Sequence, residues 1–324
     1  LVFLAMSATI SPASATTLGI SGDKFTINGQ PTFLLGTSYF DAPYWKTSDL
    51  DALKTRKFNL IRIFLNWGDT GSGSLGLSHS YFNSDGSMRN TQSLLNLITA
   101  CDQRGIIVDV TILHTVSPAL KARDVAIRNA VSLLGSRPNV FFDIMNEHVF
   151  TAAGATSTAV SHSTLSTLMS VARQANASAK LTFSSYEDHL LSSDTTVNSV
   201  NMDEELATGI QVVTPHLRRT LDWYDKTDVR VTAIKNYLAA RGKVRPIYLQ
   251  EEQRTGGGDG GGELPATQFL QAAKEAKTAG AAAWIFHTDA GFDMTTQTFM
   301  SQLSTVEQQI ANTIGNHVFG SPDT

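Results

Sequence analysis

Strand-like and helical segments alternate along almost the whole chain, and this alternation constrains the fold more than any other feature. Many of the strand segments are continuous apolar runs, as expected for strands that helices cover from outside. The predicted strands are residues 33–38, 58–65, 106–112, 140–145, 181–185, 209–214, 244–250 and 281–286. The predicted helices are residues 47–56, 91–104, 121–136, 157–179, 195–206, 228–241, 265–279 and 297–313. Eight strand-then-helix units in one chain of 324 residues predict a single α/β domain, a (β/α)8 TIM barrel.

The segments around the first strand favour a barrel over an open, doubly wound sheet. Residues 20–33 predict a short N-terminal β-hairpin with an Asn28-Gly29 turn, which we expect to close the N-terminal end of the barrel. An open sheet would carry a GxGxxG turn after its first strand, and residues 35–40 do not. The glycine-rich stretch 256–262 is not followed by Lys-Ser or Lys-Thr, so we interpret it as a loop. The first predicted helix is expected to be capped by Thr47-Ser48-Asp49.

The two ends of the chain are interpreted separately from the barrel. Residues 1–15 resemble the remnant of a signal peptide, with an apolar run followed by the small-x-small site Ala13-Ser14-Ala15. The barrel is therefore predicted at 16–316 with a tail at 317–324, in a secreted or periplasmic protein. No other apolar run approaches the ~20 residues that a membrane span needs, so no membrane span is expected.

The amino-acid composition limits the classes of partner and cofactor that we expect for this chain. The chain has 25 Lys and Arg against 29 Asp and Glu, and this absence of basic excess argues against nucleic acid as a partner. The single cysteine, Cys101, forms no internal disulfide and is predicted to be a core residue. No cofactor is expected, and a monomer is expected. A metal site at His216, His287 and Asp289 is conceivable, but no HxH or HExxH spacing supports it, and no metal is predicted. His79, His162 and His189 are interpreted as surface residues.

Two predicted strands end in a carboxylate. The run 141–147 ends at Glu147 and the run 245–251 ends at Glu251. Two acids at the mouths of two strands of one barrel are the groups that split a glycosidic bond, whereas either acid alone could be a solvated strand-end charge. Glu252 follows directly, and neighbouring strand residues point to opposite sides, so only one of the pair faces the mouth. The spacing from Pro246 favours Glu251.

Other strand ends carry amide, imidazole, guanidinium and aromatic groups, which suit sugar hydroxyls and the C–H faces of sugar rings. These candidate substrate-binding residues are Tyr39, Arg62, Trp67, His114, Asn146, His216 and Trp284. The predicted partner is an oligo- or polysaccharide.

These motifs, in this order, resemble glycoside hydrolase clan A, the retaining (β/α)8 hydrolases, and most closely the cellulase and mannanase family 5. The resemblance rests on Arg62, Asn146-Glu147, His216, Pro246 with Glu251, and Trp284, and it spans nearly the whole chain after residue 15. It implies Glu147 as acid/base and Glu251 as nucleophile. It also implies that Asn146 binds the sugar 2-hydroxyl, that Arg62 steadies the nucleophile, and that Trp284 floors the subsite of the cleaved sugar.

One departure and several alternatives follow from the same residues. The family usually has His-x-Tyr on strand six, and this chain has His216-Leu217-Arg218, so Arg218, Trp223 or Tyr224 is expected to replace the tyrosine beside the nucleophile. The function predicted is a secreted retaining β-glycosidase that hydrolyses β-linked glycans. The alternatives are a transglycosylase of the same fold, a sugar-binding barrel without catalysis, and a metal-dependent barrel enzyme.

Overall fold

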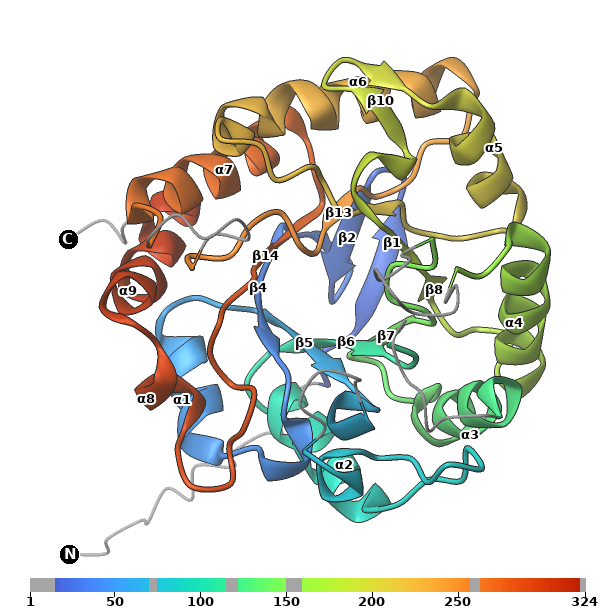
Figure 1. Cartoon of the computed structure of the whole chain (residues 1–324), viewed down its shortest axis with the longest axis vertical. Helices are drawn as coiled ribbons and strands as arrows, with labels where there is room; N and C mark the ends of the chain where they lie inside the picture. The colour runs from blue at the N-terminus through green and yellow to red at the C-terminus, as the bar shows by residue number, and fades with distance from the viewer. Residues whose placement is uncertain (1–14, 70–74, 115–121, 150–158, 257–262, 321–324) are drawn as a thin grey trace, which may run out of the picture.

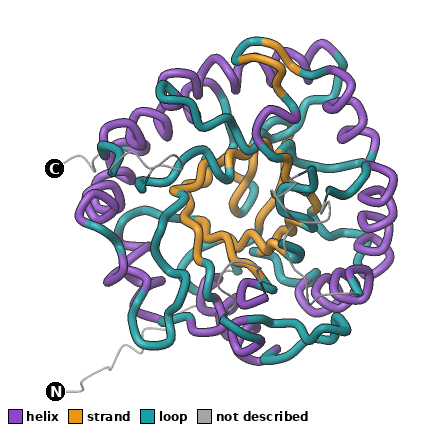
Figure 2. The backbone as a smooth tube through the Cα atoms, in the orientation of Figure 1, coloured by secondary structure: helices purple, strands orange, loops and turns teal. Residues whose placement is uncertain are grey.

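The centre of the molecule is a ring of parallel strands enclosed by helices (Figure 2). The computed structural model describes residues 15–69, 75–114, 122–149, 159–256 and 263–320. Seven strands form one parallel sheet in the order β13-β14-β4-β5-β6-β7-β8. They are β4 (Leu34–Tyr39), β5 (Leu60–Phe64), β6 (Ile107–Thr111), β7 (Val140–Asp143), β8 (Leu181–Thr182), β13 (Tyr248–Leu249) and β14 (Ala283–Phe286). Of the segment interpreted as a signal-peptide remnant, residues 1–14 lie outside the described residues.

Two further strand segments close the ring. β9 (Ser184–Ser185) follows β8 directly after Phe183 and pairs in parallel with β12 (Thr214–Pro215). Just before β12, Val213 forms a parallel bridge with Ile247, which precedes β13. β8 and β9 therefore occupy one strand position and β12 the next, and the ring returns through β13 and β14 to β4. The fold is a closed (β/α)8 barrel, which confirms the predicted fold class.

The helices form an outer ring around the strands (Figure 1). They are α1 (Thr47–Thr55), α2 (Thr91–Asp102), α3 (Arg123–Leu134), α4 (His162–Ala175), α5 (Ser199–Ala207), α6 (Thr227–Ala240), α7 (Ala266–Ala279), α8 (Phe299–Gln302) and α9 (Thr305–Phe319). Cys101 is buried in α2, as expected. Within the described residues, no helix combines the length and the apolar composition that a membrane crossing requires.

The helix predicted at 297–313 is two helices. Ser304 starts α9 with a capping box: its Oγ accepts from Glu307 N at 3.1 Å, and Glu307 Oε2 accepts from Ser304 N at 2.9 Å. This local hydrogen bonding separates α8 from α9. α9 then continues to Phe319, past residue 316.

Two other predicted helices begin later than expected. The helix predicted at 195–206 begins at Ser199 because a short hairpin of β10 (Leu191–Ser193) and β11 (Thr196–Val197) precedes it. The helix predicted at 157–179 begins at His162, and its first two residues lie outside the described residues.

The predicted hairpin covers one end of the barrel. β1 (Leu18–Ser21), β2 (Lys24–Ile27) and β3 (Gln30–Pro31) form an antiparallel sheet, and β1 and β2 are visible through the ring in Figure 1. Asn28 and Gly29 both have positive φ, as their two-residue turn requires. Phe25 of β2 packs against the rings of Phe141 and Tyr248, which face the barrel interior. The hairpin therefore closes the interior apolar core at the end opposite the site.

Strand side chains alternate between the barrel interior and the layer beneath the helices. On β5, Leu60 belongs to the interior core, whereas Ile61 and Ile63 belong to the larger core between strands and helices. On β14, Ile285 faces inward and Trp284 outward. We refer to these two sides as the interior and the outer core.

The expected cap of α1 has a different role. α1 begins at Thr47 after Lys46, whose side chain makes no capping hydrogen bond. Asp49 is buried instead, and its carboxylate accepts from the backbone N of Phe299 at 3.0 Å and of Met300 at 3.3 Å. Asp49 therefore ties α1 to the start of α8, because those two amides have no partner within their own short helix.

Gly315 of α9 provides a test of this packing. A Cβ at this position would overlap the backbone oxygen of Arg56 at the end of α1. Gly315→Ala should lower the free energy of unfolding by about 1–3 kcal/mol through this overlap, although alanine adds about 1 kcal/mol of helix propensity. Urea unfolding measures the change. Thr313→Ala, at an exposed position of the same helix, is the control and should stay within about 0.5 kcal/mol. Equal stability of Gly315→Ala and the parent would contradict the packing of α9 on α1.

Candidate active site

A fully buried arginine at the mouth of the barrel organises the site. Arg62 of β5 donates through Nη1 to Glu251 Oε1 at 2.5 Å and through Nε to Thr111 Oγ1 at 2.9 Å. Its Nη2 donates to Asn146 Oδ1 at 2.5 Å and to Asp143 Oδ2 at 3.0 Å. One side chain therefore fixes groups from three other strand positions. Asp143 lies inside a continuous strand-like run, so the sequence pattern does not distinguish it from an ordinary strand residue.

The two predicted acids lie close together. One carboxylate oxygen of Glu147, one of Glu251 and a ring nitrogen of His216 all lie within 4.8 Å of one another. The side chain of Glu147 is 14% exposed and that of Glu251 is 8% exposed, so both line the barrel mouth without being freely solvated. The structure thus brings together the acids that the sequence placed 104 residues apart.

Glu251 is surrounded by positive charge. Burial alone would raise the pKa of its carboxyl, but the cationic groups around it outweigh burial and hold the pKa well below its usual range. Arg62 supplies a permanent charge at 2.5 Å, and Arg219 Nη2 lies 3.5 Å from the other oxygen. Glu251 is therefore a carboxylate over the ordinary pH range.

Glu147 has a backbone conformation that is uncommon for a residue other than glycine. Its φ is +47°, in the left-handed region. Its backbone N donates to Ser184 Oγ at 3.0 Å, and Ser184 Oγ donates in turn to Asp143 Oδ2 at 3.2 Å. The preceding Asn146 donates its backbone N to Leu113 O. This turn allows two consecutive residues, Asn146 and Glu147, both to face the site.

His216 connects the acid to the barrel interior. Its Nδ1 lies 2.9 Å from Glu147 Oε1, and its Nε2 lies 3.2 Å from Gln250 Oε1. Both neighbours are oxygen acceptors, so the ring is placed to hold a proton on each nitrogen. Burial would lower the pKa of His216, but the carboxylates of Glu251 and Glu147 outweigh burial and raise it.

A second layer of polar groups holds Gln250. Its Nε2 donates to Asp109 Oδ2 at 2.7 Å, and Tyr248 OH donates to the same oxygen at 2.8 Å. Burial raises the pKa of Asp109 to about 7, with Arg62 opposing this effect. The orientation of His216 is therefore set by a chain of hydrogen bonds that runs into the barrel interior.

His287 and Arg219 make the contact with Glu251 that the resemblance assigns to a tyrosine. His287 Nε2 lies 3.4 Å from Glu251 Oε2, and its Nδ1 lies 2.7 Å from Ser38 Oγ. Burial lowers the pKa of His287 well below its usual value, so the ring is neutral. Trp223, one of the predicted replacements, is buried in the outer core against Phe269. Arg218, the residue at the tyrosine position, is followed by Arg219, which makes the contact.

An aromatic wall stands beside Glu251 and His287. The ring of Phe40 packs on those of Phe64, Trp67, Phe292 and His287, with centroid distances of 4.5 to 5.7 Å. Trp67 Nε1 donates to Phe292 O at 2.8 Å. The candidate His114 lies against Trp67 at 6.3 Å. Trp67 and His114 are therefore at the mouth, where the sequence put them.

Two predicted substrate-binding residues, Tyr39 and Trp284, do not face the site. Tyr39 is fully buried in the outer core, and its hydroxyl donates to Asp49 Oδ2 at 3.0 Å. Trp284 is 1% exposed in the outer core, where its Nε1 donates to Glu252 Oε2. The reason is strand alternation: on β4 Ser38 faces inward, and directly after β14 the inward position nearest the mouth is His287.

Glu252 lies on the opposite side of its strand position from Glu251. It is buried beneath the helices, where it accepts from Trp284 and lies 2.8 Å from Thr227 Oγ1. Burial raises the pKa of Glu252 to about 7. Glu252 is a member of the outer core rather than of the site.

The three histidines predicted at the surface are not there. His79 is buried, and its Nδ1 lies 2.9 Å from Asp41 Oδ1. His162 and His189 are half-buried beside His148 and Glu205. Each histidine has a polar partner inside the fold, which the sequence pattern does not reveal.

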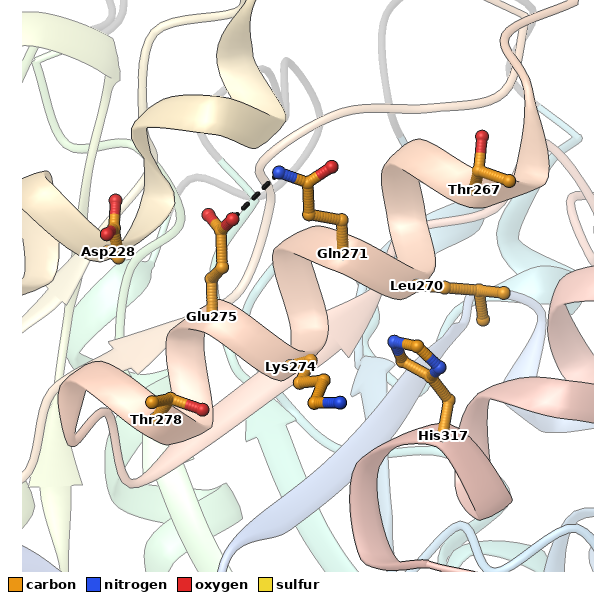
Figure 3. A pocket seen from close by; sticks show the side chains of 8 residues that line it. All are labelled: Asp228, Thr267, Leu270, Gln271, Lys274, Glu275, Thr278 and His317. Carbon is orange, nitrogen blue, oxygen red and sulfur yellow. Dashed lines mark hydrogen bonds between the residues drawn. The ribbon is translucent and has the colours of Figure 1, made fainter.

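A groove of about 520 Å³ lies on the outer ring of helices, away from these acids. Figure 3 shows its lining on α6, α7 and α9, including Leu270, Lys274 and His317. Gln271 donates to Glu275 at 2.8 Å along α7, an ordinary contact between successive helical turns. No residue of the Arg62 network lines the groove, so we do not assign it to the site.

Comparisons with known proteins agree with this geometry. The family model for cellulase, glycosyl hydrolase family 5, matches residues 19–188. A search of curated proteins found no match. Among solved structures, a beta-glucanase from Saccharophagus degradans in complex with cellotetraose is similar over 97% of both chains, with 14% identity and a TM-score of 0.62. A beta-1,4-D-mannanase from Cryptopygus antarcticus is similar over 93% of this chain and 95% of that one, with 12% identity and a TM-score of 0.61.

A third structure is longer than this chain. A family 5 glycoside hydrolase from Bacteroides vulgatus is similar over 88% of this chain, with 12% identity and a TM-score of 0.62, and this chain spans 65% of its length. At these identities the likeness shows the fold.

The raised pKa of Glu252 predicts a pH dependence of stability. The folded protein keeps a proton to about pH 7 that the unfolded chain releases near 4.5, so stability is complete below 4.5 and falls as pH rises toward 7. Glu252→Gln, which is neutral throughout, should remove this loss, worth up to about 3 kcal/mol. Denaturant unfolding between pH 5 and 8 measures it. Asp109, whose pKa is also raised to about 7, is present in both proteins. The difference between the two stability curves therefore reports Glu252 alone. Parallel curves for the variant and the parent would contradict the burial of Glu252 as described.

Proposed function

The chain belongs to glycosyl hydrolase family 5 and is a glycoside hydrolase, and from this premise we propose that it cleaves β-linked glycans with retention of configuration, with Glu251 as nucleophile and Glu147 as acid/base. The observation that carries this proposal is the short separation of the two acids, whose nearest atoms lie within 4.8 Å. Retaining enzymes hold their carboxyl groups about 5–5.5 Å apart, whereas inverting enzymes need about 6.5–9.5 Å to admit a water.

In the first step Glu251 attacks the anomeric carbon. Its carboxylate is ionised, because the positive groups around it lower its pKa, and Arg62 holds one of its oxygens. The bond from the anomeric carbon to the glycosidic oxygen breaks as the bond to Glu251 forms. Asn146, held by Arg62, is placed to bind the sugar 2-hydroxyl beside the reacting carbon.

The proton for the leaving group comes from the pair formed by Glu147 and His216. The two side chains are 2.9 Å apart, and the neighbouring carboxylates raise the pKa of His216, so the pair is placed to share a proton. Glu147 delivers this proton to the glycosidic oxygen. In the second step Glu147 takes a proton from water, which attacks the anomeric carbon and releases Glu251.

Water is the proposed acceptor because the family is one of hydrolases. A barrel that only bound sugar would have no use for an ionised Glu251, a proton-holding His216 and a strained Glu147 in one place. The structural neighbours named as a mannanase and a glucanase suggest a β-linked glucan or mannan as substrate class. The apolar run before Thr16 suggests that the enzyme is secreted or periplasmic.

The nucleophile is tested by chemical rescue. Glu251→Ala should lower turnover of an aryl β-glycoside by at least about a thousandfold. Azide should restore activity by entering the space left by the carboxylate, with the inverted glycosyl azide as product. Glu252→Gln is the matched control and should keep most of the activity, since Glu252 lies in the outer core. If Glu251→Ala stays active, and a Glu252→Ala variant is inactive and rescued by azide, Glu252 and not Glu251 is the nucleophile, which contradicts the proposal.

The role of His216 is tested by the pH profile. The pair of His216 and Glu147 loses its proton as pH rises through the raised pKa of His216, so the rate should fall on the alkaline side. His216→Asn should displace this alkaline limb to lower pH and lower turnover by about a hundredfold for substrates with poor leaving groups. Aryl glycosides with acidic phenols, which need little proton donation, should be affected much less. An unchanged alkaline limb would remove His216 from proton delivery.

A further inference from the structure

A second cluster of titratable side chains lies behind the acid/base residue. It consists of His148, His162, His189 and Glu205, and we call it the histidine cluster. Each residue offers one donor atom, and the four donors all lie within 4.8 Å of one another. Three of the four come from loops or helix ends that the barrel fold brings together, so no local sequence motif announces them.

Three donors of the cluster have no hydrogen-bond partner. Among the described residues, His162 Nε2, His189 Nε2 and Glu205 Oε2 are buried and unpartnered. Glu205 is fully buried, so its free oxygen has no access to water. Unpaired buried polar atoms are rare in folded proteins, because each costs about 1–3 kcal/mol. Three around one centre indicate a missing partner that all three share.

In two of the rings, those of His148 and His162, the nitrogen that faces away from the cluster (Nδ1) already has a partner. His148 Nδ1 lies 3.2 Å from Val160 O, and His162 Nδ1 lies 2.7 Å from Glu204 Oε2. Both neighbours are acceptors, so each Nδ1 is placed to carry the hydrogen. His162 Nε2 then presents a lone pair to the cluster. His148 Nε2 lies 3.1 Å from Glu205 Oε1, and an ion would take the place of the proton in that contact. Metal-bound histidines show this arrangement, with the second ring nitrogen donating to a carbonyl or a carboxylate.

The remaining two ligands complete the set. Glu205 Oε1 lies 3.1 Å from His148 Nε2 and 3.7 Å from His189 Nε2, and Ser185 Oγ donates to it. Asn201 Nδ2 lies 3.2 Å from His189 Nδ1, a contact that must break if His189 is to bind through Nε2.

We propose that the histidine cluster binds one divalent transition-metal ion of the zinc type, through Nε2 of His148, His162 and His189 and the carboxylate of Glu205. Three imidazoles and a carboxylate form a tetrahedral set that zinc favours, with Zn–N bonds of about 2.0–2.1 Å. Donors on such an ion are roughly 3.4 Å apart. The half-buried rings of His162 and His189 would rotate to bring the donor atoms, which now lie within 4.8 Å of one another, to this spacing.

The ion has a structural role beside the proposed catalytic acid. His148 directly follows Glu147, its backbone N donates to Ser184 O at 3.1 Å, and its ring packs on Phe183 in the outer core. The metal would therefore tie the strained turn at Glu147 to α4 and α5. A second group of possible ligands, around Asp41 and His79, differs from the histidine cluster. Both carboxylate oxygens of Asp41 already have partners, Met294 N and His79 Nδ1, so Asp41 has no need of an ion.

The test measures metal binding and stability on the full chain. Protein stripped by a chelator and returned to Zn²⁺ should bind one ion per chain. Its Tm should rise by about 4 °C at a free Zn²⁺ concentration about 100 times Kd. His162→Gln should lose both effects, and His317→Gln, a histidine on α9 far from the cluster, should keep them.

Cobalt provides a readout that does not depend on the variants. Co²⁺ in the stripped parent should give the visible absorption bands of a four-coordinate ion, and these bands should disappear on competition with Zn²⁺. Equal metal content and an equal Tm shift in the parent and His162→Gln would overturn the proposal. If His162→Gln does not fold, a parent without four-coordinate Co²⁺ bands would overturn it alone. Metal-dependent turnover at unchanged Tm would overturn the structural role.

Discussion

The site depends on one buried positive charge. Burial alone would lower the pKa of Arg62, but Glu251, Asp143 and Asp109 outweigh burial and raise it, so the guanidinium stays charged without contact with water. A buried charge is tolerated only with partners of good geometry, and loss of one partner costs about 3–5 kcal/mol. The same contacts that satisfy Arg62 hold Glu251, the proposed nucleophile, ionised and position Asn146. Stability of the barrel mouth and reactivity of Glu251 therefore have a common origin.

Much of the fold and part of the site could be predicted from sequence because both follow from periodicity. The alternation of strand and helix predicted the closed barrel, and strand-ending acids predicted the position of Glu147 and Glu251 at the mouth. Alternation within a strand also explains the failures. Trp284 and Tyr39 have suitable chemistry, yet each occupies an outward position. Ser38, one residue before Tyr39, and His287, three residues after Trp284, face the site. Predicting this requires the strand bounds to within one residue.

Other parts of the site had no signal in the sequence. Gln250 and Glu251 are consecutive and both contact His216, because β13 ends at Leu249 and strand alternation ends with it. Asn146 and Glu147 both face the site because of a positive φ, which their residue types do not predict. The histidine cluster joins residues from four separated segments. Such features depend on how the loops after each strand pack, and hydrophobic pattern carries little information about loops.

Whether Glu147 and Glu251 act as a closely spaced pair is tested most directly by the configuration of the first product. In the proposed mechanism Glu251 attacks carbon itself, and the two successive inversions give net retention. Proton NMR during the first turnovers of a β-linked oligosaccharide distinguishes the anomers before mutarotation mixes them. The β-anomer should appear first, and the α-anomer should follow slowly. An α-anomer as the first product would contradict the mechanism, even with the barrel as described.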